Sequence, residues 1–121
     1  METVNINDEE QIDDLLCDGL KIMQKNGVFR YGTDAVLLAN NAVVPDGANV
    51  LDIGTGTGII PILLSKKSKA CHLTGLEIQP DMAEMAQRSI ALNSLEDKIN
   101  IVCGDICDAD KYLKKNFYDV I

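Results

Sequence analysis

The chain has 121 residues, of which 46% are hydrophobic, so it can form a core but is too short for more than one domain. Its formal net charge is −8, yet seven acidic residues fall within the first 20 positions, where there is no Lys or Arg, and the remainder is nearly neutral. The absence of a long apolar run excludes a membrane-spanning helix, and the acidic N-terminus is unlike a secretory signal. We therefore expect a cytoplasmic protein that binds no membrane.

The four cysteines are spread along the chain and lack paired C-x-x-C spacing. Cys103 and Cys107 are the only close pair, and the single histidine, His72, lies far from them in the sequence. This pattern does not favour a zinc site, so we expect reduced, buried thiols and no bound metal.

Residues 1–32 read as an N-terminal extension. Residues 1–19 are polar and lead to a turn at Asp18-Gly19, after which residues 20–24 alternate between apolar and polar side chains. The alternation predicts a short strand, and Asn26-Gly27 predicts a hairpin turn into residues 28–31.

A helix follows, capped by Thr33 or Asp34 and ended by Pro45-Asp46-Gly47. The preceding stretch, residues 29–34, is rich in polar and aromatic groups. It either closes over a ligand or merely caps the helix with a solvent-facing Arg30.

The chain is organised around a glycine-rich loop. The apolar run 50–53 enters Gly54-Thr55-Gly56-Thr57-Gly58, and a second apolar run, 59–64, leaves it. This predicts a buried strand, a tight turn and the start of a helix, with main-chain N–H groups open to an anionic group.

Two kinds of cofactor site compete with a purely structural turn here. The dinucleotide fingerprint is G-x-G-x-x-G, but Ile59 stands where its third glycine would be. The spacing is instead D-x-G-x-G-x-G, with Asp52 two residues before Gly54. The acid and the spacing favour a different nucleotide cofactor over NAD.

The second predicted strand, residues 70–78, ends in an acid. Glu77 lies 19 positions beyond Gly58, near the spacing at which a carboxylate accepts from ribose hydroxyls. A solvated carboxylate at the end of a strand is the alternative. Pro80 then begins a long helix that ends near Asn93, with methionines on its apolar side.

A third strand, residues 99–103, is followed by Gly104-Asp105-Ile106. Asp105 is placed to accept from the exocyclic amine of an adenine, and Ile106 and Ile78 to enclose its ring. Residues 111–116 form a short helix or turn, and residues 117–121 begin a fourth strand.

Strands that alternate with helices predict an α/β fold with a parallel sheet. If the strand at 50–53 lies at the centre, the order of the four strands is 3-2-1-4, and a ligand binds at their carboxyl ends. Residues 33–121 would form this cofactor-binding unit. The fourth strand stops abruptly, so we expect the front half of a larger domain.

These motifs resemble a known family. D-x-G-x-G-x-G after a strand is similar to motif I of the class I S-adenosylmethionine (SAM) methyltransferases, which have a Rossmann-like fold. Residues 27–39 and 51–61, with Gly75–Gln79 and Gly104–Ile106, resemble the bacterial tRNA1(Val) adenine-N6 methyltransferases. The resemblance implies an enzyme that moves a methyl group from SAM to the exocyclic amine of an adenine next to the tRNA anticodon.

The resemblance also implies roles for individual residues. The loop from Gly54 through Thr55 and Gly56 to Gly58 would approach the methionine part of SAM, and Asp52 would orient the loop or the amino group. Glu77 would hold the ribose. The adenine would lie against three residues, Ile78, Asp105 and Ile106. Four residues would help to cover the cofactor: Arg30, Tyr31, Thr33 and Asp34.

One part of the family pattern is missing from this chain. An Asn-Pro-Pro-aromatic motif follows the fourth strand in the family and exposes the lone pair of the target amine, but the chain ends at Ile121. We therefore expect the chain alone to bind SAM at most weakly and not to methylate. The alternatives are a protein glutamine N5-methyltransferase, an NAD-dependent oxidoreductase and a non-catalytic binding module.

Overall fold

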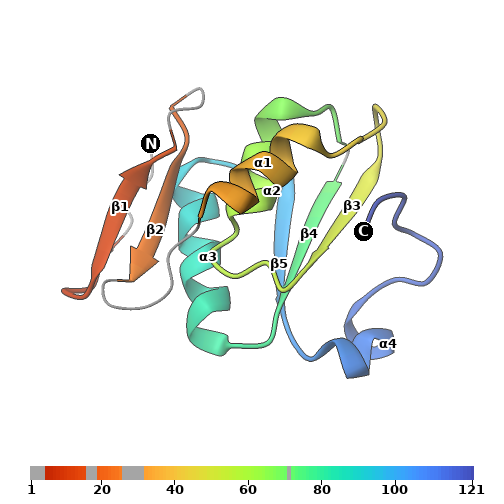
Figure 1. Ribbon diagram of the computed structural model, residues 1–121. Helices are drawn as coiled ribbons and strands as arrows, with labels where there is room; N and C mark the ends of the chain where they lie inside the picture. Colours follow the sequence, from red (N-terminus) through yellow and green to blue (C-terminus); the bar gives the residue numbers. More distant parts are fainter. Residues whose placement is uncertain (1–4, 16–18, 26–31, 71) are drawn as a thin grey trace.

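A computed structural model describes residues 5–15, 19–25, 32–70 and 72–121. A three-stranded parallel sheet forms its centre, in the order β3-β4-β5. The strands are β3 (Asn49–Ile53), β4 (His72–Glu77) and β5 (Ile99–Cys103). Figure 1 shows these strands between an N-terminal hairpin on one side and the C-terminal segment on the other.

Helices connect the strands as the apolar pattern predicted. They are α1 (Thr33–Asn41), α2 (Ile59–Lys67), α3 (Pro80–Leu92) and α4 (Ala109–Tyr112), with a short 3-10 turn, η1 (Ile106–Asp108). Side chains of β3, β4 and β5 form one core with apolar residues of α2 and α3. Their burial is the main stabilising contribution, since buried apolar area dominates the folding free energy.

The predicted strand order, 3-2-1-4, is confirmed: β5, β4 and β3 lie in that order, and the C-terminal segment follows β3. The fourth strand is reduced to a single bridge. Val120 pairs in parallel with Val50, and the Leu51 amide donates to the Val120 carbonyl oxygen at 2.9 Å. The Asp119 carboxylate also accepts from the Asn49 amide at 2.8 Å. Residues 119–120 therefore lie on the side of β3 opposite to β4.

The N-terminal hairpin differs from the predicted one. β2 (Lys21–Lys25) pairs antiparallel with β1 (Glu10–Asp14), a strand that the sequence did not predict because Ile12 is its only apolar residue. The predicted partner strand, residues 28–31, lies outside the described residues.

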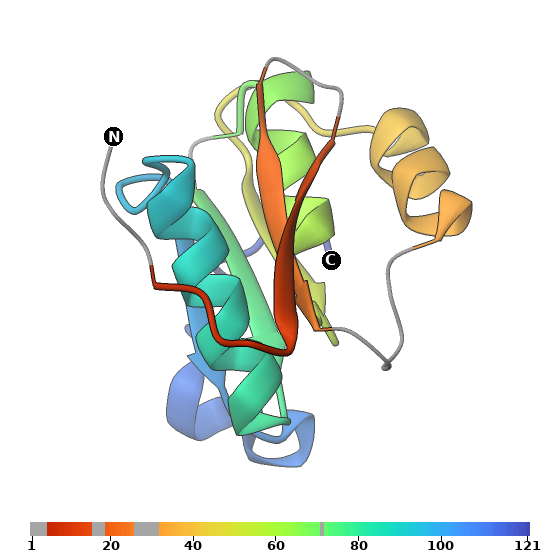
Figure 2. The same ribbon diagram turned by 90° about the vertical axis from the view of Figure 1, so that its left-hand side faces the viewer.

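Helix α3 lies beside β2 (Figure 2). Its side chains and that of its C-cap residue, Asn93, bind main-chain groups of β2. The Asn93 side chain accepts from the Lys21 amide at 2.8 Å and donates to the Lys21 carbonyl at 2.6 Å. The buried Ser89 hydroxyl oxygen accepts from the Met23 amide at 2.8 Å. These bonds pair main-chain groups that a further strand would otherwise have to satisfy.

An ion pair adds a second attachment of the hairpin to α3. Arg88 donates from both terminal nitrogens to the Glu10 carboxylate, at 2.6 and 2.5 Å, and also pairs with Glu84 on its own helix. The Glu10 side chain is 6% exposed, so water screens this pair weakly. The hydrogen bond from Arg88 lowers the pKa of Glu10 from 4.5 to about 2.

Two smaller predictions need correction. Gly32 is the N-cap residue of α1 and makes no side-chain cap, so neither Thr33 nor Asp34 caps the helix as predicted. Cys103 and Cys107 are free thiols, but both are exposed and not buried as predicted. Cys103 is the last residue of β5, and Cys107 lies in η1. Within the described part of the chain, no helix has the length and apolar character that crossing a membrane requires.

The Glu10–Arg88 pair predicts a pH-dependent stability. Because folding lowers the pKa of Glu10, the pair stabilises fully above pH 4.5 and its contribution is lost as the pH falls towards 2. We expect Glu10→Gln to lower the free energy of unfolding at neutral pH by about 2 kcal/mol. The variant should also lose less stability than the unmodified chain as the pH falls towards 2. Urea unfolding between pH 2 and 7 measures both effects.

The neighbouring Glu9 provides the control. Its carboxylate is 76% exposed and lies 3.8 Å from Lys25, so Glu9→Gln should change stability by less than about 0.5 kcal/mol. If the two variants lost the same amount of stability between pH 7 and pH 2, the role given to Glu10 would be contradicted.

Candidate functional site

The glycine-rich loop joins β3 to α2 and adopts a conformation that favours glycine. Gly54, Gly56 and Gly58 have φ angles of +73°, +60° and +83°. In this left-handed region, the Cβ of an L-residue crowds the following carbonyl oxygen, at a cost of about 1–2 kcal/mol per residue. The alternate glycines therefore let the chain turn sharply from the strand into the helix.

The carboxyl end of β4 holds the loop through hydrogen bonds. The amides of Gly54 and Thr55 both donate to the Leu76 carbonyl oxygen, at 2.8 and 3.0 Å. The next amide, that of Gly56, donates to Glu77 Oε1 at 2.9 Å. Ile53 pairs with Leu76, so the loop begins where Glu77 ends its strand.

Glu77 thus points towards the loop, as its predicted role requires. Its second oxygen, Oε2, accepts from the Gln79 amide at 2.9 Å, and Gln79 is the N-cap residue of α3. The residue is only 6% exposed. Each carboxylate oxygen has a further lone pair, so these bonds leave acceptor capacity for hydroxyl groups of a ligand.

Asp52, on β3, and Thr55, in the loop, each contribute one more polar atom to this region. Asp52 Oδ2 and Thr55 Oγ1 are buried, and neither has a hydrogen-bond partner among the described residues. Burial raises the pKa of the Asp52 carboxyl above 3.8, the adjacent Thr55 side chain partly offsets this, and the charge of Glu77 adds to the rise. Buried polar atoms without partners are uncommon and mark this as a candidate ligand site.

A pocket of about 160 Å³ lies beside the loop. Its wall combines the start of α1, the loop, the first turn of α2 and one residue of α3. Ten residues line it: Gly32, Asp34, Ala35, Gly54, Thr55, Gly56, Thr57, Ile59, Ile60 and Met82. Asp34 is thus brought to the loop as predicted, whereas Thr33 is not among the lining residues.

Three other predicted residues, Ile78, Asp105 and Ile106, are not among the residues that line this pocket. Ile78 is 58% exposed, and Asp105 Oδ1 accepts from the Cys107 amide at 2.9 Å, which caps η1. Ile106 borders a separate apolar groove of about 380 Å³, together with Leu51 and Ile53. Arg30 and Tyr31 lie outside the described residues.

The sequence interpretation missed Gly75 on β4 and six of the ten residues that line the pocket, which are Gly32, Ala35, Thr57, Ile59, Ile60 and Met82. Met82 was assigned to the core but lines the pocket, and Gly32 lines it from the start of α1. Gly75 lies opposite Asp52 in the sheet, and a Cβ there would come within 2.7 Å of Thr55 Cγ2 and 2.8 Å of its Oγ1. A glycine inside a buried strand was the one available signal, because it indicates a close approach by another segment.

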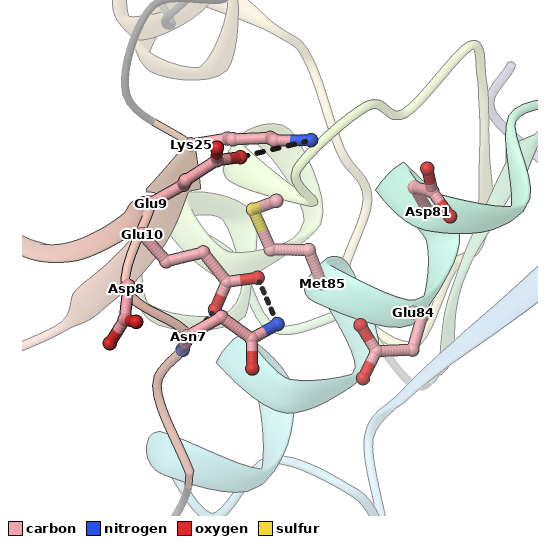
Figure 3. Close-up of a pocket in the computed structure, with 8 residues that line it drawn as sticks. All are labelled: Asn7, Asp8, Glu9, Glu10, Lys25, Asp81, Glu84 and Met85. Atoms are coloured by element: carbon pink, nitrogen blue, oxygen red, sulfur yellow. Dashed lines mark hydrogen bonds and ion pairs between the residues drawn. The ribbon is translucent and has the colours of Figure 1, made fainter.

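Another pocket, of about 660 Å³, lies between the hairpin and α3 and is mainly acidic (Figure 3). Asp8, Glu9 and Glu10 border it from the hairpin side, and Asp81 and Glu84 from α3. Figure 3 shows Lys25 paired with Glu9, and Glu10 accepting from Asn7. The carboxylates of Glu9 and Glu10 thus have protein partners, and no residue of the glycine loop lines this pocket.

The close fit of Thr55 over Gly75 can be tested directly. We expect Gly75→Ala to lower the free energy of unfolding by about 2 kcal/mol, because the new methyl group overlaps Thr55 and Ile101 Cδ1. Adding Thr55→Ala should remove most of that overlap, so the double variant should lose less than the sum of the single variants. Urea unfolding of the four proteins measures the coupling, and additive losses would contradict the fit.

Comparison with known proteins places this geometry in a family. The sequence model described as "Methyltransferase domain" matches residues 50–121, the segment that contains β3, the glycine loop, Glu77 and Asp105. The chain is also similar to a tRNA1(Val) (adenine(37)-N6)-methyltransferase of Phocaeicola vulgatus, with 35% identity over 77% of this chain and 38% of that protein. A protein of the same name from Porphyromonas gingivalis is 38% identical over 73% of this chain and 36% of its own length.

A solved structure shares the fold. TYW2 of Pyrococcus horikoshii, in complex with MeSAdo, superposes with a TM-score of 0.74 and 18% identity, over 94% of this chain and 42% of that one. The chain spans well under half the length of the two tRNA1(Val) methyltransferases named above. Because the family model covers more than half of its residues, the chain belongs to the methyltransferase domain family.

Proposed function

We propose that this chain is the SAM-binding part of an N6-adenine methyltransferase that acts on tRNA. The observation that carries the proposal is the pairing of Glu77 with Gly56, which joins an acid at the end of β4 to the glycine loop after β3. The names of the curated relatives supply the reaction and the substrate: transfer of a methyl group to adenine 37 of tRNA1(Val). Such an enzyme would work in the cytoplasm with tRNA as its partner.

The residues of the loop suit a bulky cationic nucleoside. Apart from the glycine itself and its two neighbours in the chain, no atom of the described residues lies within 4 Å of the position that a Cβ would take at Gly54 or Gly56, so a ligand can approach the main chain there. Asp52 and Glu77 supply two carboxylates beside that space, and SAM carries a cationic sulfonium and an amino group. When bound, SAM would supply an electrophilic methyl group.

Within this proposal each residue has a distinct task. Glu77 would accept from the ribose hydroxyls through its remaining lone pairs, and Asp52 would hold the amino group or the loop. The methionine part of SAM would lie against four residues of the loop, Gly54, Thr55, Gly56 and Gly58. The cofactor would be covered by Asp34 together with Arg30, Tyr31 and Thr33. Ile78, Asp105 and Ile106 would contact the adenine ring. Holding these groups in place lowers the barrier through proximity and orientation.

A matched pair of glycine variants tests the cofactor site. Gly54 and Gly47 have φ angles of +73° and +77°, and neither Cβ position comes within 4 Å of any described residue beyond its two chain neighbours. Both changes to Ala should therefore cost a similar 1–2 kcal/mol or so of stability. Only Gly54→Ala should weaken binding of S-adenosylhomocysteine, by roughly tenfold or more, because its methyl group would enter the space proposed for the cofactor.

Titration calorimetry measures these affinities, and NAD serves as the competing ligand. Tighter binding of NAD than of S-adenosylhomocysteine would favour an oxidoreductase. Equal affinities of the Gly47 and Gly54 variants would contradict the placement of the cofactor at the loop.

A transfer assay tests the reaction. We expect a protein that contains this chain and has the full length of the curated relatives to move labelled methyl from SAM to bulk tRNA and to form N6-methyladenosine. Nucleoside analysis by mass spectrometry identifies the product. Label on a protein glutamine with none on tRNA would assign the alternative amide substrate.

A further inference from the structure

We infer that Glu77 is a positioning residue that links the middle of the glycine loop to the start of α3 before any ligand binds. This role goes beyond the ribose contact proposed above and rests on bonds within the chain, so it does not depend on that proposal. A residue that serves only as a ligand contact would leave the loop unchanged when replaced.

Three consecutive amides of the loop show why Glu77 is critical for its position. Those of Gly54 and Thr55 bind a main-chain carbonyl, which no side-chain substitution removes. The third, that of Gly56, is bound by the Glu77 side chain alone among the interactions of the described residues. The middle of the loop therefore depends on one carboxylate.

The other oxygen of the same carboxylate extends the connection to a second segment. Glu77 Oε2 accepts from the Gln79 amide at the N-cap of α3, while Oε1 accepts from Gly56. A single group thus joins the β3–α2 loop, which lines the candidate site, to the β4–α3 loop. With only 6% of the residue exposed, water cannot readily replace either bond.

The chemistry of the two bonds requires a carboxylate rather than an amide. An ionised carboxylate has two acceptor oxygens, which match two N–H donors. A glutamine has one acceptor oxygen and one NH₂ donor, so one of the two main-chain amides would face another donor. Glu77→Gln keeps the shape of the side chain but must release Gly56 or Gln79.

Hydrogen exchange of the cofactor-free chain, followed residue by residue by NMR, tests this inference. In Glu77→Gln we expect exchange of the Gly56 amide, the Gln79 amide or both to become at least about tenfold faster, because unbonded amides lose protection. The amides of Gly54 and of core strand β5 should change less. Glu96→Gln, an exposed carboxylate on the surface, is the matched control and should leave all of these rates unchanged.

Ile78→Ala separates the two roles. It removes an exposed side chain proposed to contact adenine, so it should weaken S-adenosylhomocysteine binding without altering Gly56 exchange. Unchanged protection of both Gly56 and Gln79 in Glu77→Gln, with only the affinity lowered, would overturn the inference. Faster exchange in a chain that binds no S-adenosylhomocysteine would leave it standing while the proposed function fails.

A second measurement decides the case in which Glu77→Gln does not fold. In the unmodified chain, low concentrations of urea reveal which amides exchange through the same opening. We expect the Gly56 and Gln79 amides to share one opening with the same urea dependence, because one carboxylate binds both. Independent openings of the two amides would overturn the inference.

Discussion

The parallel register between β3 and β4 is the constraint on which the candidate site depends. Ile53 lies opposite Leu76, so the loop leaves β3 at the level where Glu77 completes β4. In a strand, alternate side chains point to opposite faces, and a shift of one residue would turn Glu77 away from the loop. The same alternation places Asp52, Gly75 and Glu77 on one face, where α2 and α3 also pack.

The site concentrates negative charge under a segment of main-chain donors. Asp52 is buried near the Glu77 carboxylate, which is one reason why the pKa of Asp52 is raised. The N–H groups of Gly56 and Gln79 stabilise the Glu77 charge, whereas Asp52 Oδ2 has no such partner among the described residues. The main-chain donors therefore stabilise the charge of Glu77, whereas burial disfavours the charge of Asp52.

Helix α3 connects the hairpin to the candidate site. Its first turn contributes Met82 to the pocket, and its later turns hold the hairpin through Arg88, Ser89 and Asn93. Gly32 and Asp34, which follow the hairpin in the chain, return to line the same pocket. The hairpin of β1 and β2 therefore packs against α3, which binds main-chain groups of β2 that would otherwise lack partners.

The sequence by itself determined the alternating strands and helices, the loop and the position of Glu77 at the end of a strand, because these follow from local patterns. Apolar periodicity marks buried strands and helices, and alternate glycines mark a turn that other residues strain to adopt. Only the tertiary structure decided the pairing of β1 with β2, the fit of Thr55 over Gly75 and the joining of two loops by Glu77. These contacts join residues far apart in the chain, or depend on which way a side chain turns, and a linear pattern carries neither kind of information.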